Sequence, residues 1–537
     1  MKTVIISIAP MSIEELLAIV DGAPVELDAD ARHRIAASRA VVDSVLRSGQ
    51  PVYGLNTQVG HGKDTRLSEE EIRGQQHWLV MTHAGGFGPP LPTASVRAAL
   101  AVRLNGIVRG GSGASLAAAD TLAAMLNAGV HPLVPSTASV GAGDLGQMAG
   151  MAQVAIGLGR AEYDGEEMFG GEALQRAGIP PLQLEAKDGL ALVSSNAVSI
   201  GMAALVVAHA EQTMAAADTV VALSMEATDA NPSITLPLVA EAKPIPGQIA
   251  AAAHLRHELA GSRLLQPGTD HSVQDALSFR VAPQVHGALR EYVTAARRAV
   301  EVELNAASDN PLVAIDEQTI VSNGNFHVMV LAIAFDALRV AVAHVGMLSD
   351  RRMSHLWDAF MQRMAAGPPP PEAMATLAGV QLRYPAAAAV GELKQLAAPA
   401  TLDVPPLDLG VEDHGTGAPL SVTKAAAALD LLDDLLAIEL LIARDVLSVS
   451  GPLPTLGRGT SEAVRMVDEA KSKAAQPTPD AVHAALRERF PALDPAGLTL
   501  TSPAGSARTR SARDSEREEP ANERIRPRSG STPVIRW

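Results

Sequence analysis

The stretch Ser139-Val140-Gly141-Ala142-Gly143-Asp144-Leu145 carries the most information in this chain of 537 residues. In this stretch Ala142 is followed directly by Gly143. Further distinctive stretches lie on both sides, within about residues 10 to 495. The most specific are Tyr53-Gly54-Leu55-Asn56-Thr57, Thr82-His83-Ala84-Gly85-Gly86, Lys187-Asp188-Gly189-Leu190-Ala191-Leu192, Gln274-Asp275-Ala276-Leu277-Ser278-Phe279-Arg280 and Glu412-Asp413-His414.

Taken together, these stretches resemble the motifs of the histidine/phenylalanine ammonia-lyase superfamily. In that superfamily the first segment reads Ser-Val-Gly-Ala-Ser-Gly-Asp-Leu, and its Ala-Ser-Gly cyclises into the methylidene-imidazolone (MIO) electrophile. Cyclisation removes water from the serine and leaves an exocyclic methylidene carbon. Here the degenerate segment Ala142-Gly143-Asp144 has lost that serine. We therefore expect that MIO is absent and that the protein uses no other cofactor.

The resemblance implies a mainly α fold, the ammonia-lyase fold, with a small mixed α/β N-terminal part and a long central helical bundle. We expect the mixed part over residues 1–190, the bundle over 191–501 and a tail over 502–537. The tail is rich in arginine, serine, glutamate and proline, a composition that predicts disorder. Apolar residues recur at helical spacing over stretches longer than an average helix, at 190–226, 285–305, 328–364 and 423–449.

Charge and cysteine content narrow the possible partners and sites. The net charge of −16 disfavours nucleic acid or an anionic membrane surface as the main partner. The absence of cysteine excludes disulfides and thiolate metal sites, and it fits a reducing cytoplasm, which is the location we expect. Histidines do not occur as a paired His-x-x-x-His, so we expect no metal site.

The N-terminus and the apolar stretches indicate neither export nor membrane insertion. A short apolar run ends at Pro10, and Ser12-Ile13-Glu14-Glu15 is typical of a capping box that opens a helix. We expect the stretch 328–348 to be the most apolar part of the chain. Because it carries Asp336, Arg339 and His344, it is expected to be a buried bundle helix and not a membrane span.

The resemblance assigns roles to Tyr53 and His83. The tyrosine matches the base that removes the β-proton of the substrate, and the histidine matches a residue that faces the substrate ring. Taken alone, a turn tyrosine and a lone histidine are more often structural, so both roles depend on the resemblance. Gln58 and Val59 replace the Gly-Phe that relatives mostly carry, which predicts a changed pocket wall.

The segment from Gln274 to Arg280 resembles a Gln-Asp-x-Tyr-Ser-x-Arg motif whose arginine clamps the substrate carboxylate. A guanidinium group can bind a carboxylate through two parallel hydrogen bonds. We expect Arg280 to be this anchor and Gln274 to contact the substrate. Ser194 stands where relatives usually carry an asparagine beside the amino group and the MIO ring, and we expect Ser194 and Asn196 to bind substrate.

The remaining matched residues favour an imidazole-type substrate. Glu412 matches a glutamate that lies near the imidazole in the histidine enzymes, and Lys394 matches a lysine of the same enzymes. Phe326 is a candidate pocket wall, although ordinary core packing would explain it equally well. We expect Glu412 and Lys394 to take part in catalysis together with Tyr53 and Arg280.

These residues and the missing serine resemble the MIO-lacking branch of the superfamily, the ergothionases. Those enzymes split the trimethylbetaine ergothioneine into thiolurocanate and trimethylamine. A quaternary ammonium leaves as a neutral amine and has no lone pair to add to an electrophile, so MIO is not needed. The resemblance also implies a homotetramer with active sites shared between subunits, and an amino acid or betaine as the small-molecule substrate.

Two other interpretations stay open at this point. A histidine ammonia-lyase or aminomutase would need a non-standard MIO, for which Ala138-Ser139-Val140 is the nearest serine-centred tripeptide. Valine in place of glycine should hinder the close backbone approach that cyclisation needs. A catalytically silent structural paralogue is the third possibility, and the joint presence of Tyr53, Arg280 and Glu412 argues against it.

Overall fold

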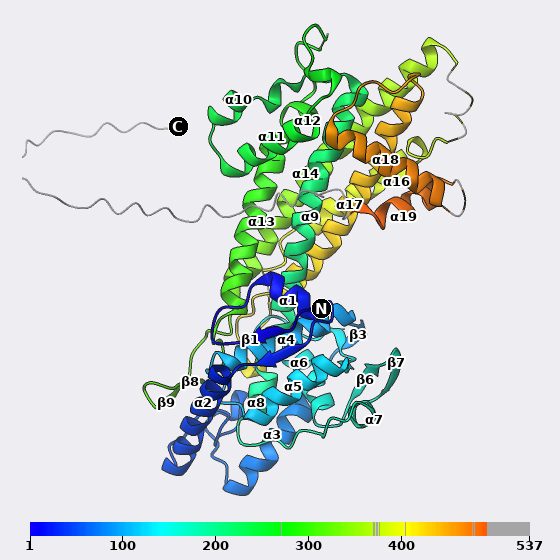
Figure 1. The fold of residues 1–537 in the computed structure, drawn as a ribbon. Helices are drawn as coiled ribbons and strands as arrows, with labels where there is room; N and C mark the ends of the chain where they lie inside the picture. The colour runs from blue at the N-terminus through cyan, green and yellow to red at the C-terminus, as the bar shows by residue number, and fades with distance from the viewer. Residues whose placement is uncertain are drawn as a thin grey trace, which may run out of the picture. The chain divides into compact units, whose positions relative to one another are not determined.

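Four long helices pack against one another and dominate the fold in the computed structural model (Figure 1). Small aliphatic residues, chiefly alanine, leucine and valine, fill the space between them and let the helices lie close together. The predicted mainly α fold with a long helical bundle is confirmed. The four helices are α9 (Ala197–Thr228), α13 (Ala282–Leu304), α14 (Met329–Ala366) and α17 (Ala418–Ser448).

The first long helix differs from the sequence prediction, which was uninterrupted over 190–226. The structure has a short helix α8 (Asp188–Val193), then a break, and α9 starts after Asn196. In the break, the backbone carbonyl of Ser195 accepts a hydrogen bond of 2.7 Å from the backbone N–H of Asp144. The chain therefore leaves the helical path where it pairs with the degenerate segment.

Short helices and small sheets make up the region before α8. The capping box predicted at Ser12 is present, since Ser12 and Glu15 each bond the other's backbone N–H. Strand β1 (Val4–Ile6) runs parallel to β2 (Val25–Leu27), β3 (Phe87–Pro90) pairs antiparallel with β5 (Pro135–Thr137), and β4 (His131–Pro132), β6 (Arg160–Tyr163) and β7 (Glu166–Phe169) form an antiparallel sheet. The helices are α1 (Ile13–Val20), α2 (Ala29–Ser48), η1 (Gly60–Gly62), α3 (Glu69–His83), α4 (Thr93–Val108), α5 (Leu116–Ala128), α6 (Leu145–Ala155) and α7 (Gly170–Arg176).

Shorter elements accompany the long helices. Glycine permits one close crossing, because a Cβ on Gly247 of α11 would lie 2.3 Å from the carbonyl oxygen of Gly287 in α13. These elements are η2 (Pro232–Thr235), α10 (Pro237–Glu241), α11 (Pro246–Glu258), η3 (Arg263–Leu265), α12 (Leu277–Arg280), the hairpin of β8 (Leu312–Ala314) and β9 (Thr319–Val321), η4 (Val380–Leu382), α16 (Arg383–Leu396), η5 (Asp408–Gly410), α18 (Arg458–Lys473) and α19 (Pro479–Arg487).

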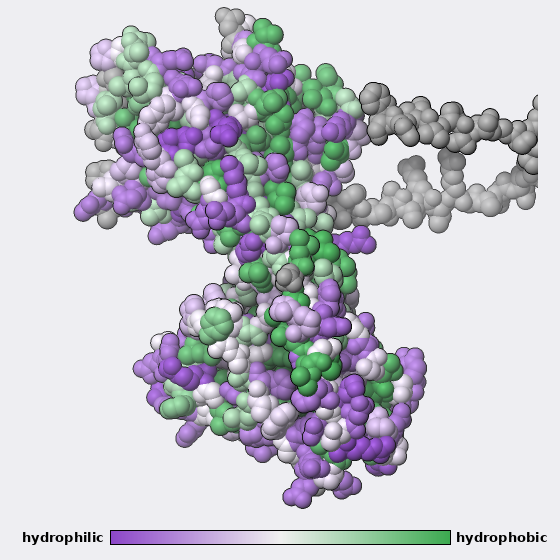
Figure 2. All heavy atoms as spheres, turned by 180° about the vertical axis from the view of Figure 1, so that it is seen from behind, coloured by the Kyte–Doolittle hydropathy of each residue, from purple (hydrophilic) through white to green (hydrophobic). Residues whose placement is uncertain are grey.

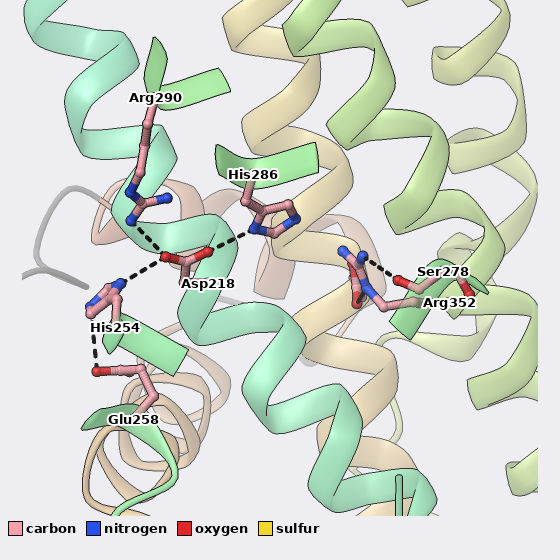
Figure 3. A network of polar contacts seen from close by, with 8 residues as sticks. Asp218, His254, Glu258, Ser278, His286, Arg290 and Arg352 are labelled. Carbon is pink, nitrogen blue, oxygen red and sulfur yellow. Dashed lines mark hydrogen bonds and ion pairs between the residues drawn. The ribbon is translucent and has the colours of Figure 1, made fainter. Parts of the chain in front are cut away.

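A buried polar network around Asp218 of α9 ties the long helices to α11 (Figure 3). The fully buried carboxylate bonds Arg290 at 2.6 Å, His286 at 2.7 Å and His254 at 3.0 Å. Burial alone would raise the pKa of Asp218, but Arg290 and the two histidines hold that pKa far below its usual range. The carboxylate is therefore charged and fully paired. These bonds offset the free-energy cost of removing its charge from water.

Within the part of the chain that the structure describes, two helical stretches are long and apolar enough to cross a membrane by length and composition alone. The more apolar is Asp188–Thr228, with a mean hydropathy of 2.0 in its best window, and not the stretch 328–348 as expected from the sequence. The structure buries 83% of that window, and 56% of the corresponding window in Met329–Ala366. Such burial is typical of core helices of a bundle.

The structure describes residues 1–490, with gaps at 270, 369–370, 372–373, 375, 403, 475 and 477 and without the side chain of residue 73. The described residues belong to one compact unit. The position at 190 of the expected division lies inside this unit, and the division itself stays a prediction. The tail predicted over 502–537 and the last residues of the predicted bundle region lie outside the described residues.

Candidate active site

A cavity of about 700 Å³ opens between the N-terminal region and the segments that lead into α14 and α17. Its volume suits a small amino acid or betaine. The structure brings six of the residues proposed from the sequence together in its wall. They are Tyr53, His83, Ala142, Ser194, Phe326 and Glu412.

Tyr53 lies in a tight loop before α3, held with its hydroxyl in the cavity wall. The backbone N–H of Gly60 donates a hydrogen bond of 3.0 Å to the Tyr53 Oη. Burial raises the pKa of the Tyr53 phenol, and the carboxylates of Glu412 and Asp408 raise it further, while the Gly60 bond opposes them. Gly54 allows the loop to form, because it has a φ of +63° and a Cβ there would meet Leu190 at 2.6 Å.

His83 and Glu412 form a second part of the wall. His83 ends α3, and its Nδ1 lies 2.9 Å from the backbone carbonyl of Leu79. Because a carbonyl only accepts, Nδ1 donates this bond, and Nε2 is left for another partner. Burial raises the pKa of Glu412, the charge of Asp408 adds to this, and His83 opposes it. The pair offers a substrate ring the imidazole Nε2 of His83 and the carboxyl group of Glu412.

The degenerate segment forms the floor beside this pair. Ala142 lines the cavity, whereas Asp144 behind it is fully buried. The Asp144 carboxylate accepts hydrogen bonds from the backbone N–H and the hydroxyl of Ser199, at 2.8 and 2.9 Å. Burial raises the pKa of Asp144 and these bonds oppose the rise. Gly143 has a φ of +88°, a conformation that favours glycine.

Backbone contacts attach the degenerate segment to the start of α17. The N–H of Gly417 donates to the Val140 carbonyl at 3.0 Å, and the Thr416 hydroxyl donates to the Gly141 carbonyl at 2.9 Å. A Cβ on Gly141 would lie 2.1 Å from the Thr416 Oγ1. The segment and the loop that carries Glu412 are thus packed against each other without room for a side chain at 141.

Ser139, the only serine-centred alternative for cyclisation near the segment, is fully engaged. Its Oγ lies 2.9 Å from Asp144 Oδ1 and 3.0 Å from the Gly143 carbonyl oxygen. The same Oγ accepts a hydrogen bond of 3.0 Å from the Gly141 N–H. The hydroxyl therefore acts as a structural element of this turn.

The expected substrate contacts Ser194 and Asn196 are placed differently. Ser194 lines the cavity, but Asn196 is buried beneath it and does not. Both polar atoms of the Asn196 side chain lack a hydrogen-bond partner among the described residues. Asn196 thus lies under the floor of the site in this structure.

Phe326 lines the cavity together with two histidines to which the sequence analysis gave no role. His327 Nε2 and His414 Nδ1 lie 3.0 Å apart, and their ring centres are separated by 4.9 Å. Burial lowers the pKa of His327, and the neighbouring His414 lowers it further. His327 directly follows Phe326 in the sequence, and His414 ends the quoted stretch Glu412-Asp413-His414, so these positions were the available signal.

Arg280, Gln274 and Lys394 do not line the cavity of a single chain. Gln274 and Lys394 are exposed, and Arg280 is half-buried at the end of α12. Helix α12 is fixed near the middle of α14, where Arg352 donates to the Ser278 carbonyl at 3.2 Å (Figure 3). Phe326 and His327 precede the first turn of α14, about 35 Å away along the helix by its rise per residue.

The attachment of α12 is rigid, because Arg352 is itself locked. Its guanidinium bonds both carboxylate oxygens of Glu439 at 2.6 and 2.9 Å, and both side chains are fully buried. The Nε of Arg280 is buried without a hydrogen-bond partner among the described residues. The structure therefore fixes helix α12, which ends at Arg280, at a place remote from Tyr53 of the same chain.

Asp408 is the main site residue that sequence reasoning missed. It lines the cavity and bonds His61, a residue 347 positions earlier, through both carboxylate oxygens. No short motif contains the two residues, and only the fold brings them together. Its charge acts on both Tyr53 and Glu412.

Comparisons with known proteins agree with this geometry. Residues 11–469 match the sequence model of the family described as aromatic amino acid lyase. A histidine ammonia-lyase of Myxococcus xanthus is 37% identical over 465 residues, which cover 85% of this chain and 90% of the relative.

Two solved structures are similar over 92% of this chain. The ergothionase of Treponema denticola, an ergothioneine-degrading enzyme in complex with desmethyl-ergothioneine sulfonic acid, has a TM-score of 0.83 at 28% identity and is covered over 99% of its length. The histidine ammonia-lyase of Trypanosoma cruzi has a TM-score of 0.81 at 30% identity and is covered over 94%. The chain belongs to the aromatic amino acid lyase family and is a carbon–nitrogen lyase.

Proposed function

We propose that this lyase releases trimethylamine from ergothioneine without an MIO group. The observation that carries the proposal is the direct join of Ala142 to Gly143 in the cavity floor. Tyr53, His83 and Glu412 are nevertheless retained in the same cavity. In a catalytically silent paralogue, nothing would favour keeping these three groups in one cavity. Their retention beside the missing electrophile supports an active enzyme that works without MIO.

The contacts of Ser139 support the absence of MIO from a neighbouring tripeptide. Cyclisation over 138–140 would have to dehydrate a hydroxyl that Gly141, Gly143 and Asp144 hold in place. Valine at position 140 also restricts the backbone more than the glycine of the usual tripeptide. No step of the proposed reaction therefore passes through this group.

The chemistry of the leaving group explains why the electrophile can be dispensed with. A primary amine, in its unprotonated form, is activated in the family by adding its nitrogen to MIO. A trimethylammonium has no lone pair to add, and it already leaves as a neutral tertiary amine. Elimination then needs a base for the β-proton and stabilisation of the charge that develops as this proton leaves.

Each proposed residue has a defined part in this elimination. Tyr53, as the phenolate, takes the β-proton; the C–H electron pair forms the C=C bond, and the C–N pair leaves with trimethylamine. Glu412 and His83 hold and polarise the thio-imidazole ring, which takes up part of the developing charge, and Lys394 joins them from another subunit. Arg280 binds the carboxylate and Gln274 contacts the substrate, both also from another subunit. Ser194 and Phe326 line the substrate pocket, with Asn196 beneath its floor.

A homotetramer with shared sites accounts for the position of Arg280. The cavity of one chain holds the proposed base, whereas the proposed carboxylate anchor is about 35 Å away along α14 of that chain. Apolar surface gathers in the middle of the face shown in Figure 2, and exposed apolar side chains on α14 include Val330, Ile333 and Val340. Such a surface is suited to burial between subunits. We expect this assembly to act in the cytoplasm.

Histidine ammonia-lyase activity is the second candidate, because the Myxococcus xanthus relative carries that name at 37% identity. It differs from the proposal in requiring a primary amine to leave. The two candidates therefore predict different amines from different substrates, which makes them separable in one assay.

We expect purified enzyme to release trimethylamine from ergothioneine and, more slowly, from histidine betaine, with little ammonia from histidine. The ring sulfur should help because it can hold additional charge. Amine identity measured by mass spectrometry and the absorbance of the conjugated product give two independent readouts. Faster release of ammonia from histidine than of trimethylamine from ergothioneine would favour the second candidate.

A further inference from the structure

The loop that carries the proposed base is joined to the turn that carries Glu412 through a single side chain, Asp408. One carboxylate oxygen accepts a hydrogen bond of 2.9 Å from the backbone N–H of His61, and the other lies 2.9 Å from His61 Nδ1. The side chains of Asp408 and His61 are 27% and 66% exposed, so the contact lies at the rim of the cavity. We call this pair of bonds the Asp408–His61 clasp.

The clasp lies next to the group that bonds the Tyr53 hydroxyl. Gly60, the residue before His61, donates its N–H to Tyr53 Oη at 3.0 Å. Gly60 has a φ of +61°, and a Cβ at this position would lie only 2.3 Å from Asp408 Oδ2. The Asp408 carboxylate thus fills the space beside Gly60. The Gly60 backbone is held with its N–H directed at the Tyr53 hydroxyl.

The backbone of Asp408 is held in a conformation that side chains rarely adopt. Asp408 and the following Leu409 have φ values of 46° and 55°, a left-handed conformation that is uncommon for residues other than glycine, although aspartate adopts it more readily than leucine. The turn is closed by paired bonds between Leu407 and Glu412, at 2.8 and 3.3 Å. Such a conformation persists only where the surroundings impose it, and it concentrates at functional sites.

We infer that Asp408 is a positioning residue, which through the clasp sets the Gly60 N–H against the Tyr53 hydroxyl and fixes the distance between Tyr53 and Glu412. The inference rests on the proposed role of Tyr53 as the base. Asp408 itself makes no bond to Tyr53 among the described residues. Its effect on the reaction is exerted through Gly60 and through its charge.

The charge of Asp408 gives this role a pH signature. The charged and titratable groups that line the cavity with Tyr53 are Asp408, Glu412, Asp413, His61, Lys63, His83, His327 and His414. Burial is the first cause of the raised pKa of Tyr53, and the two carboxylates contribute to it. A base works only when it is deprotonated, so removing one carboxylate charge should move the rising limb of activity to lower pH.

Two substitutions at one position separate geometry from charge. Asparagine in Asp408→Asn can still pair with both groups of His61, because a neutral imidazole can carry its proton on either nitrogen. Alanine in Asp408→Ala removes the clasp as well as the charge. Asp64→Asn is the matched control, because Asp64 is an acid in the same loop, is 89% exposed, and among the described residues pairs only with Lys63.

We expect Asp408→Asn to keep its plateau kcat within about threefold while its rising limb moves down by roughly 0.5–1 pH unit. Asp408→Ala should lose about tenfold or more in kcat, because the base is no longer held in place. In a Tyr53→Phe background, Asp408→Ala should have almost no further effect, as expected of residues that act as a unit. Thermal unfolding checks that every variant is folded.

An ultraviolet titration tests the inference without turnover. The alkaline absorbance change that parent protein shows and Tyr53→Phe lacks reports the ionisation of Tyr53, and Asp408→Asn should move this change to lower pH. If the titration moves but Tyr53→Phe stays fully active, the clasp stands and the proposed base is wrong. If Asp408→Ala has the kcat, pH profile and tyrosine titration of Asp64→Asn, the inference is overturned.

Discussion

Replacing Tyr53 by phenylalanine is expected to lower kcat for amine elimination by about 10² or more while the protein stays folded. Phenylalanine keeps the aromatic ring in its place and removes only the hydroxyl that would accept the β-proton. That hydroxyl has one hydrogen-bond partner among the described residues, the N–H of Gly60. Loss of this bond should cost no more than about 1 kcal/mol of stability.

Two quantities are measured for each protein: steady-state turnover of ergothioneine, and the midpoint of thermal unfolding, which shows that the protein is folded. A parallel Tyr163→Phe variant is a matched control, because Tyr163 ends strand β6 and does not line the cavity. It should turn over substrate like the parent. A folded Tyr53→Phe protein with near-normal turnover would remove Tyr53 from the mechanism.

Replacing Arg280 by lysine is expected to raise KM for ergothioneine by about tenfold or more, although the positive charge is kept. Lysine lacks the planar fork that binds a carboxylate through two parallel bonds. The Ser278 carbonyl and its bond from Arg352 should hold α12 in the variant as in the parent. An Arg280→Lys protein as active as the parent would show that the carboxylate is bound elsewhere.

Mixed oligomers show whether Arg280 serves the cavity of another chain. Tyr53→Phe and Arg280→Lys subunits co-expressed in one cell would assemble some sites with the intact tyrosine of one chain and the intact arginine of another. Turnover by the mixture should then exceed that of either variant alone. A mixture no more active than its components would place the anchor within one chain or outside the site.

Much of the fold could be predicted because helical periodicity is a local property of the sequence. The four long helices lie where apolar residues recur at helical spacing, and the capping box at Ser12 was readable from residue types alone. The break between α8 and α9 could not be predicted in this way. It depends on the bond from the Asp144 N–H to the Ser195 carbonyl, a contact between segments distant in sequence.

The candidate site also contains residues that a local sequence pattern reveals and residues that only the fold brings together. Tyr53, His83 and Glu412 belong to recognisable motifs, and the fold brings all three into one cavity. Asp408 belongs to no motif and is paired with His61 across 347 positions, so it was missed. The remote position of Arg280 was equally hidden, because no sequence pattern states which copy of the chain a side chain serves.

The most direct test of MIO-independent elimination is turnover of ergothioneine before and after treatment with borohydride, combined with the intact mass of the protein. Borohydride attacks the methylidene carbon of MIO enzymes. We predict unchanged release of trimethylamine, and a mass that equals the encoded chain without loss of water. Ammonia release from histidine that is abolished by borohydride, or by Ser139→Ala, would show that an unconventional MIO forms and would contradict the proposal.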